Sequence, residues 1–192
     1  MSNRIVIIGA GGVGREIAAT LMHANFKDIE VVGFVDDTVK QGSAIHLLQV
    51  LGNIDWLIAK RGSQDYGLVI AIGNPKIRRD IIERIGEGFD YPTIIHPNVS
   101  IHNNGRVKIG KGCYIGDGCI MTTDITIEDF CFINTGCSLQ HDTILKMNSV
   151  LMPGVRITGG ATIGRHSLIG ANCVITKAIE INEGSTIFES II

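Results

Sequence analysis

The chain has 192 residues, of which 45% are hydrophobic and 19% are charged, and its formal net charge is −2. This balance fits one large or two small globular domains, and it offers no basic surface for nucleic acid or an anionic membrane. No basic segment precedes an apolar one at the start, and no apolar run approaches the roughly 20 residues of a membrane span, so neither a signal peptide nor a transmembrane helix is expected.

The first ninety residues alternate apolar runs with helical stretches. Strands are expected where β-branched residues gather, and helices where apolar residues recur every three to four positions. The expected strands are 4–8, 30–35 and 67–72, the expected helices are 15–24 and 76–85, and one further helix is expected within 38–65. This alternation predicts a small α/β, Rossmann-like domain with a parallel sheet over residues 1–92.

A glycine-rich turn joins the first expected strand to the first expected helix. It reads Gly9-x-Gly11-x-x-Gly14, and Asp36 and Asp37 follow the second strand. Glycines permit a tight turn, and the start of a helix offers free N–H groups to a phosphate. The turn therefore predicts binding of a nucleotide-sugar diphosphate, with the two acids at the ribose or the base. NAD(P) binding is the second interpretation, and the third is that the glycines serve only a tight strand–helix joint.

From Ile109 to Ile187 an aliphatic residue or Met returns at every sixth position. This period is neither that of a helix nor that of a plain strand, and it fits a prism in which each flat side takes one hexapeptide. Three sides make a coil of about 18 residues, and stacked coils make a parallel β-helix, here over 93–192. The Asn103–Gly105 turn and two extra residues are expected to reset the register before Ile109. The inward positions are Ile109, Ile115, Met121, Ile127, Ile133, Leu139, Leu145, Leu151, Ile157, Ile163, Ile169, Ile175, Ile181 and Ile187.

All five cysteines fall at one phase of this repeat, four residues after an inward position. We expect them to be small buried wall residues, and cysteines six residues apart to lie on adjacent sides of the prism. No Cys-x-x-Cys spacing is present for zinc or redox chemistry, and an odd number of buried thiols favours a reducing cytoplasm. We therefore expect no metal and a cytoplasmic location. The cysteines are Cys113, Cys119, Cys131, Cys137 and Cys173.

The repeat places His141 on an outer turn, beside Asp142. One coil earlier the same phase holds Thr123, and one coil later it holds Gly159. An imidazole can remove a proton from an amine or a hydroxyl near neutral pH, and a neighbouring carboxylate can hold the ring in one tautomer. The N–H of Gly159 can polarise a thioester carbonyl. The alternative is that His141 is an ordinary polar turn residue.

The unbroken repeat leaves no long loop with which one prism could build a pocket. A buried site would then need a second wall, which prisms with flat sides obtain by packing side by side. We therefore expect a homotrimer with sites at subunit boundaries. His96 is expected to be structural, and His23, His46, His102 and His166 to be polar turn residues.

Five motifs, in this order and spacing, resemble the bacterial sugar acetyltransferases of the PglD/NeuD type. That group is a branch of the left-handed β-helix, hexapeptide-repeat acyltransferases, and the resemblance covers nearly the whole chain. The motifs are IIGAGGVGRE at 7–16, GFVDD at 33–37, AIGNPKIR at 71–78, IIHPN at 94–98 and NTGCSLQHD at 134–142.

The resemblance implies an acetyltransferase that uses acetyl-CoA and acts on a nucleotide-linked amino sugar or a sialic-acid-type sugar. His141 matches the general base, Asp142 the acid that modulates it, and Asn134 a polar neighbour of that base. Gly159 matches the oxyanion donor, and attack would be direct in a ternary complex, without an acyl-enzyme. On the same template Gly11, Gly12 and Val13 match the loop on the nucleotide phosphates, Asp36 and Asp37 the nucleoside contacts, Gly73 a sugar-side contact, and Val150 and Ala171 the lining of the CoA channel.

The chain departs from the family pattern at three places. Val13 and Val150 stand where the family often has histidine, and the chain ends at Ile192 without the usual closing coil and Gly-x-Pro-Ala-Lys tail. A second hypothesis is therefore a non-catalytic accessory protein that binds a nucleotide sugar and has a decayed CoA site. N- and O-acetylation are not separated, because one base serves both acceptors.

Overall fold

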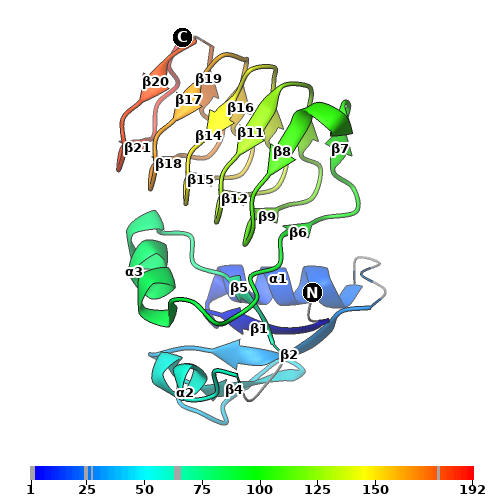
Figure 1. The fold of residues 1–192 in the computed structure, drawn as a ribbon, viewed down its shortest axis with the longest axis vertical. Helices are drawn as coiled ribbons and strands as arrows, with labels where there is room; N and C mark the ends of the chain where they lie inside the picture. Colours follow the sequence, from blue (N-terminus) through cyan, green and yellow to red (C-terminus); the bar gives the residue numbers. More distant parts are fainter. Residues whose placement is uncertain (1–2, 24–25, 27, 63–65, 177) are drawn as a thin grey trace. The chain divides into compact units, whose positions relative to one another are not determined.

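The computed structural model describes residues 3–23, 26, 28–62, 66–176 and 178–192. The chain forms two compact units (Figure 1). The first unit contains residues 1–73 and 80–92, and the second contains residues 74–79 and 93–192. The chain thus passes from the first unit to the second after residue 92. The short segment 74–79 also belongs to the second unit, which the sequence did not indicate.

The first unit is built on a five-stranded sheet in the order β3-β4-β2-β1-β5. Its strands are β1 (Arg4–Ile8), β2 (Glu30–Val35), β3 (Ala44–Ile45), β4 (Leu48–Gly52) and β5 (Gly67–Ile70). β1, β2, β4 and β5 pair in parallel, while β3 and β4 form an antiparallel hairpin. The predictions of strands at 4–8 and 30–35 are confirmed, and the third strand is shorter than predicted.

The described residues of this part of the chain form α1 (Gly12–His23), α2 (Ile54–Ile58) and α3 (Pro75–Ile85), and the first turn of α3 belongs to the second unit. α1 starts three residues before the predicted position, because the glycine turn itself enters the helix; the predicted end at residue 24 lies outside the described residues. α3 starts where Asn74 Oδ1 accepts the N–H groups of Lys76 and Ile77, with a proline at the first helical position. The region 38–65 contains the one predicted helix, but also the unpredicted β3–β4 hairpin.

The second unit is a left-handed parallel β-helix with three sides. The first side has β6 (Ile94–Ile95), β9 (Tyr114–Ile115), β12 (Phe132–Ile133), β15 (Val150–Leu151), β18 (Leu168–Ile169) and β21 (Thr186–Ile187). The second side has β7 (Ser100–Ile101), β10 (Ile120–Met121), β13 (Ser138–Leu139), β16 (Arg156–Ile157) and β19 (Val174–Ile175). The third side has β8 (Val107–Ile109), β11 (Ile125–Ile127), β14 (Ile144–Leu145), β17 (Thr162–Ile163) and β20 (Glu180–Ile181).

From β8 onward the strands pair in parallel at a spacing of 18 positions, as with Ile133 opposite Leu151 and Leu139 opposite Ile157, whereas β6 and β7 pair with β9 and β10 at a spacing of 20. The predicted three-sided coil is therefore confirmed. The two extra residues before Ile109 are accommodated by a 3-10 turn at Asn104–Arg106. We call the turns between the first and second sides the first corner, those between the second and third sides the second corner, and those that return to the first side the third corner.

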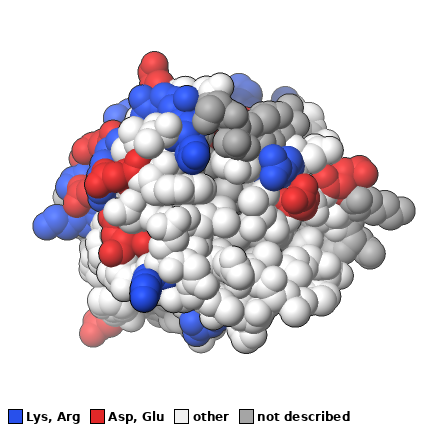
Figure 2. All heavy atoms as spheres, turned by 90° about the horizontal axis from the view of Figure 1, so that it is seen from below, with Lys and Arg blue, Asp and Glu red and all other residues white. Residues whose placement is uncertain are grey.

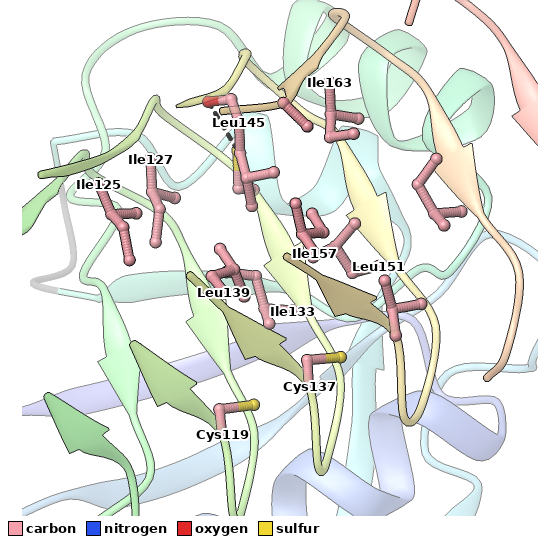
Figure 3. Close-up of a cluster of buried hydrophobic side chains, with 14 of the residues drawn as sticks. Cys119, Ile125, Ile127, Ile133, Cys137, Leu139, Leu145, Leu151, Ile157 and Ile163 are labelled. Carbon is pink, nitrogen blue, oxygen red and sulfur yellow. Dashed lines mark hydrogen bonds between the residues drawn. The ribbon is translucent and has the colours of Figure 1, made fainter. Parts of the chain in front are cut away.

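The inward positions of the repeat fill the prism (Figure 3). From Ile115 to Ile175 they are 0–2% exposed, so each hexapeptide contributes one fully buried apolar side chain. Burial of one such side chain contributes roughly 1.5–3 kcal/mol, and repetition of this contribution stabilises a unit whose strands are only two or three residues long. The six-residue repeat of the sequence thus corresponds to one buried core side chain per hexapeptide.

All five cysteines are free thiols with buried side chains, so the prediction that they pack in the wall is confirmed. They also stack between coils, which was not predicted: Cys119 and Cys137 directly precede β10 and β13, the neighbouring strands of the second side (Figure 3). The thiols lie near backbone carbonyls, as Cys131 Sγ does at 3.2 Å from the oxygen of Lys146. Within the described residues, no group of three His, Cys, Asp or Glu side chains could hold a metal ion.

Charged side chains of both signs are interspersed on the surface shown in Figure 2, and a broad part of that surface carries neither. This distribution agrees with the small net charge of −2. In the part of the chain that the structure describes, no helix combines the length and hydropathy that a membrane crossing requires.

Candidate active site

His141 lies at the second corner, in the turn that joins β13 to β14, as predicted. Its Nδ1 is 2.8 Å from Oδ2 of Asp142, and the two side chains are 63% and 68% exposed. A carboxylate is only an acceptor, so Nδ1 carries the proton of this hydrogen bond. Nε2 then keeps its lone pair and can take a proton from an acceptor that reaches this corner.

Gly159 lies one coil further along the chain, against the ring of His141. The N–H of Gly160 donates to the carbonyl oxygen of His141 at 2.9 Å, which joins the two turns. A Cβ on Gly159 would lie 3.0 Å from Cε1 and Nε2 of the ring, and φ of Gly159 is +120°. Both observations require glycine at this position. The predicted neighbourhood of the two residues is confirmed.

The coil before His141 carries Thr123 at the same corner, followed by Asp124. Thr123 Oγ1 donates to Asp124 Oδ2 at 3.1 Å, and Nη1 of Arg106 lies 2.6 Å from Asp124 Oδ1. Successive coils therefore present a carboxylate at this corner, at Asp124 and at Asp142, and one is paired with an arginine and the other with a histidine.

Asn134 lies at the first corner, in the turn that joins β12 to β13. Its Oδ1 accepts the N–H of Thr135 at 2.8 Å. The whole of β13 separates this turn from that of His141, so within one chain the two residues occupy different corners of the same coil. The structure does not bring them together in a single chain.

The two positions that match the lining of the CoA channel differ in exposure. Val150 is on the first side, in β15, and is 0% exposed. Its side chain is therefore packed inside the protein, and its match to the CoA channel stays a prediction. Ala171 follows β18 at the first corner and is exposed.

The glycine turn lies at the carboxyl end of β1 and runs into α1. Gly11 and Gly12 are exposed, and a Cβ at either would meet no other atom. A Cβ on Gly14 would overlap the carbonyl oxygen of Gly9, so the turn needs glycine there. Gly73 lies beside Val13, since a Cβ on it would be 3.9 Å from a methyl group of that residue. The turn therefore exposes backbone at the start of a helix, where an anion binds favourably.

Asp36 is engaged by the protein itself. Its Oδ2 accepts the N–H of Ala10, in the glycine turn, at 2.8 Å, and its Oδ1 accepts both the N–H and the hydroxyl of Thr38 at 2.7 Å. Partial burial on its own would raise the pKa of Asp36, but these bonds and one from the N–H of Val39 hold that pKa below its usual value. The carboxylate therefore ties the glycine turn to the end of β2.

Asp37 is engaged as well. Its Oδ1 accepts the N–H of Ile54 at 2.9 Å, and its Oδ2 lies 2.6 Å from Nη1 of Arg84. The same guanidinium reaches Asp55 Oδ1 at 2.7 Å. Both acids that match nucleoside contacts thus hold their own unit together, and a nucleotide would meet carboxylates that already have hydrogen-bond donors.

Arg78, which lies within the AIGNPKIR motif, has a structural role that the sequence did not indicate. It is fully buried in the second unit: Nε donates to Asn148 Oδ1 at 3.0 Å and Nη2 to the carbonyl oxygen of Phe130 at 2.9 Å. Its guanidinium also lies 5.3 Å from the ring centre of Phe132. Burial lowers the pKa of Arg78 to about 10. No local pattern signals this burial, because Asn148 and Phe130, both at the third corner, lie 70 and 52 positions from Arg78 in the sequence.

Two family models match the chain. The PglD N-terminal domain matches residues 4–85, and the six-repeat bacterial transferase hexapeptide matches residues 142–177. The first match includes the glycine turn of the first unit, and the second match begins at Asp142, the residue after His141.

The curated relatives named here match only about half of this chain. The bifunctional protein GlmU of Pelobacter propionicus is 37% identical over 93 residues, which are 48% of this chain and 19% of that protein. The carnitine operon protein CaiE of Escherichia coli K12 is 31% identical over 107 residues, with 49% and 53% covered. The chain thus spans between a fifth and about half of the length of these relatives.

Solved structures match over both units. The acetyltransferase domain of PglB from Neisseria gonorrhoeae FA1090, solved with acetyl coenzyme A, has a TM-score of 0.84 at 27% identity, with 97% of this chain and 88% of that chain covered. PerB from Caulobacter crescentus, solved with CoA and GDP-perosamine, has a TM-score of 0.73 at 25% identity, with 97% and 89% covered. With a PglD N-terminal domain, a hexapeptide repeat and these solved neighbours, the chain is similar over both units to the PglD/NeuD type of hexapeptide-repeat sugar acetyltransferases.

Proposed function

We propose that the protein transfers the acetyl group of acetyl-CoA to an amino or hydroxyl group of a nucleotide-linked amino sugar or a sialic-acid-type sugar. The observation that carries this proposal is the hydrogen bond between His141 Nδ1 and Asp142. It leaves Nε2 of the same ring for the acceptor, and the ring lies against the backbone of Gly159. Support comes from the similar PglB domain, solved with acetyl coenzyme A, and from PerB, solved with CoA and GDP-perosamine.

In this proposal His141 is the general base. Nε2 takes the proton of the amine or hydroxyl as that atom attacks the thioester carbonyl of acetyl-CoA, and Asp142 stabilises the protonated ring. The carbonyl oxygen becomes negative, and the N–H of Gly159 is the donor we assign to it. When the intermediate collapses, the C–S bond breaks and the proton on His141 goes to the CoA thiolate. No acyl-enzyme forms.

The first unit would hold the nucleotide part of the acceptor. We assign the phosphates to Gly11, Gly12 and Val13 at the start of α1, and a sugar-side contact to Gly73. Asp36 acts on this site through Ala10, whose N–H it holds at 2.8 Å, and so keeps the turn open. We assign the lining of the CoA channel to the positions of Val150, which is buried, and Ala171, which is exposed.

A second copy of the chain would complete the site. His141 and Asn134 occupy different corners, so a polar neighbour for His141 at the position of Asn134 must come from another chain. Prisms with flat sides satisfy this requirement when three of them pack around a threefold axis, with the first corner of one chain at the second corner of the next. We therefore propose a homotrimer, acting in the cytoplasm where nucleotide sugars and acetyl-CoA are available.

The test measures turnover of acetyl-CoA with a UDP-4-amino sugar. Release of the CoA thiol is the quantity that is monitored. The variant His141→Ala should lose about 10²–10⁴-fold in kcat while its unfolding transition is unchanged, since the side chain is exposed. His102→Ala removes another exposed histidine of the second unit and serves as the matched control. Turnover at the level of the unaltered protein in His141→Ala would show that another group is the base.

A panel of UDP-, GDP- and CMP-linked sugars would identify the acceptor, and the position of the transferred acetyl group would separate N- from O-acetylation. Calorimetry with acetyl-CoA addresses the accessory hypothesis. Binding of a nucleotide sugar without binding of millimolar acetyl-CoA would favour that hypothesis, whereas binding of both with turnover would exclude it.

A further inference from the structure

A hollow of about 350 Å³ lies in the first unit, between α1 and the β3–β4 hairpin. Ala18, Ala19 and Met22 line it from the helix, Leu48 lines it from the hairpin, and Phe34 of β2 lies at its base. None of the positions assigned above to phosphates, nucleoside or sugar lines it. Its volume is in the range of small-molecule sites, which are mostly apolar with a few polar groups.

The direction of α1 relative to the strands shows how the hollow is oriented. α1 crosses from the carboxyl end of β1 back to the amino end of β2, so it runs antiparallel to the strands. Arg15 lines the hollow near the start of α1, and His23 lines it at the end, roughly 12 Å away at 1.5 Å per residue. The hairpin loop that carries His46 also lies at the amino end of the sheet, because β4 is parallel to β2. The hollow is therefore a groove along the helix.

The polar residues that line the groove are all basic: Arg15, His23 and His46. In the part of the chain that the structure describes, none of these three side chains has a hydrogen bond or an ion pair, and no acid lines the groove. Arg15 is the one whose charge does not depend on pH. An apolar groove with an unpaired guanidinium at one end is complementary to an apolar chain that carries an anionic group.

The hairpin loop combines a left-handed backbone with an exposed apolar side chain. It consists of two residues: His46, with φ of +52°, and Leu47, which is 84% exposed. Two-residue hairpin loops favour glycine, asparagine or aspartate, and a left-handed φ is uncommon for residues other than glycine, although histidine adopts it more often than most. On the helix side Met22 is 41% exposed. Strain and exposed apolar surface thus coincide at one end of the groove, where a bound chain would cover them.

We propose that this groove binds a linear aliphatic chain with a single anionic head group, a carboxylate or a phosphate monoester. The head group lies at Arg15, and the chain runs past Ala18 and Ala19 to Leu47. The site is separate from the proposed acetyl transfer and does not depend on it. The alanines are essential to the shape, since a larger side chain at either position would occupy the groove.

Calorimetry on the full chain tests the site with decanoate, decyl phosphate and decanol, each below its micelle concentration. One molecule of either anion per chain should bind, at least tenfold more tightly than decanol. Shortening the acid from decanoate to octanoate and hexanoate should weaken binding about tenfold at each step, because each buried methylene contributes to affinity. Tighter binding of decanoate would identify the natural ligand as a fatty acid, and tighter binding of decyl phosphate would identify it as a phosphorylated lipid.

Variants locate the site. Ala19→Phe should weaken binding of decanoate at least tenfold while the unfolding transition is unchanged, because residue 19 is exposed. Arg15→Gln should reduce the affinity for decanoate to that for decanol. Gln49→Leu adds an apolar side chain at an exposed position of β4 that does not line the groove, and it should bind as the unaltered chain does.

Three outcomes would overturn the proposal. The first is the absence of saturable binding of both anions, including the case in which the protein binds only vesicles of anionic phospholipid. The second is unchanged binding in Ala19→Phe, which would place the ligand elsewhere. The third is equal affinity for decanol and decanoate, which would remove the role of the charge.

Discussion

The backbone at Gly159 constrains the ring of the proposed base, because both φ and the space beside His141 exclude a side chain. In Gly159→Ala the added Cβ would displace the ring from its present position. We expect a loss of stability of about 1–3 kcal/mol from the strained backbone, and a loss in kcat of roughly 10²-fold from the displaced ring. Denaturant unfolding and steady-state kinetics measure the two effects separately.

Gly184→Ala is the matched control, because φ of Gly184 is +70° and a Cβ there would meet no other atom. This variant should lose stability of about 1 kcal/mol and keep its kcat. If Gly159→Ala behaved in the same way as Gly184→Ala, the contact with His141 would have no part in the chemistry.

Asp36 links the stability of the first unit to pH. Its pKa is lowered from 3.8, so the folded state binds the proton less well than the unfolded chain does, and the carboxylate stabilises the fold at neutral pH. Asp36→Asn should cost about 1 kcal/mol, since the group is partly exposed. The difference from the unaltered chain should be complete above the unfolded pKa and vanish as pH falls through the lower folded pKa. Unfolding curves between pH 7 and about pH 2.5 would check this.

The same variant should weaken binding of the nucleotide sugar, because the N–H of Ala10 would lose its charged acceptor and the glycine turn would loosen. Thr38→Val removes one donor to Asp36 and leaves the bond to Ala10 in place, so it should affect binding less. A nucleotide-sugar affinity unchanged in Asp36→Asn would show that the turn needs no such support.

At the scale of elements, the first turn of α3 is part of the β-helix unit because Arg78 is buried against the third corner. Arg78→Met would fill most of the volume but leave Asn148 Oδ1 and the Phe130 carbonyl without their donor. We expect a loss of roughly 2–5 kcal/mol in the free energy of unfolding of the second unit, from two unsatisfied buried acceptors. Lys76→Met, at an exposed position two residues before Arg78, should be within about 0.5 kcal/mol of the unaltered chain.

The β-helix could be predicted from the sequence because its core and its backbone share one period. Each inward residue of the repeat, such as Leu139, pairs with another 18 positions away, so a single regularity determines strand, corner and stacking. β1 and β2 were predictable for a related reason, since both are nearly continuous apolar runs in a parallel sheet. The placement of His141 next to Gly159 followed from the same arithmetic.

The remaining features depend on contacts that no local pattern encodes. The β3–β4 hairpin has the loop His46–Leu47, which lacks the usual turn residues, so it gave no signal. The burial of Arg78 depends on carbonyl and amide groups more than 50 positions away. The engagement of Asp36 by Ala10 likewise requires knowledge of how β1 and β2 are paired.

At the scale of the whole molecule, the separation of His141 and Asn134 determines how the assembly can be tested. If the proposed site draws His141 from one chain and Asn134 from the next, then neither His141→Ala nor Asn134→Ala alone leaves a complete site. In a homotrimer mixed from the two variants, a site is complete where the histidine comes from an Asn134→Ala chain and the asparagine from a His141→Ala chain. Random assembly produces this arrangement at about a quarter of all sites.

Equal amounts of the two variants, unfolded and refolded together, should therefore recover roughly a quarter of the activity of the unaltered protein. Each variant refolded alone is the control and should stay inactive, while sedimentation should report a trimer in all three samples. Recovery depends on exchange of chains, so simple mixing without refolding should restore less. A trimer that forms but recovers nothing would mean that each site is built within a single chain, and the role assigned to Asn134 would then be wrong.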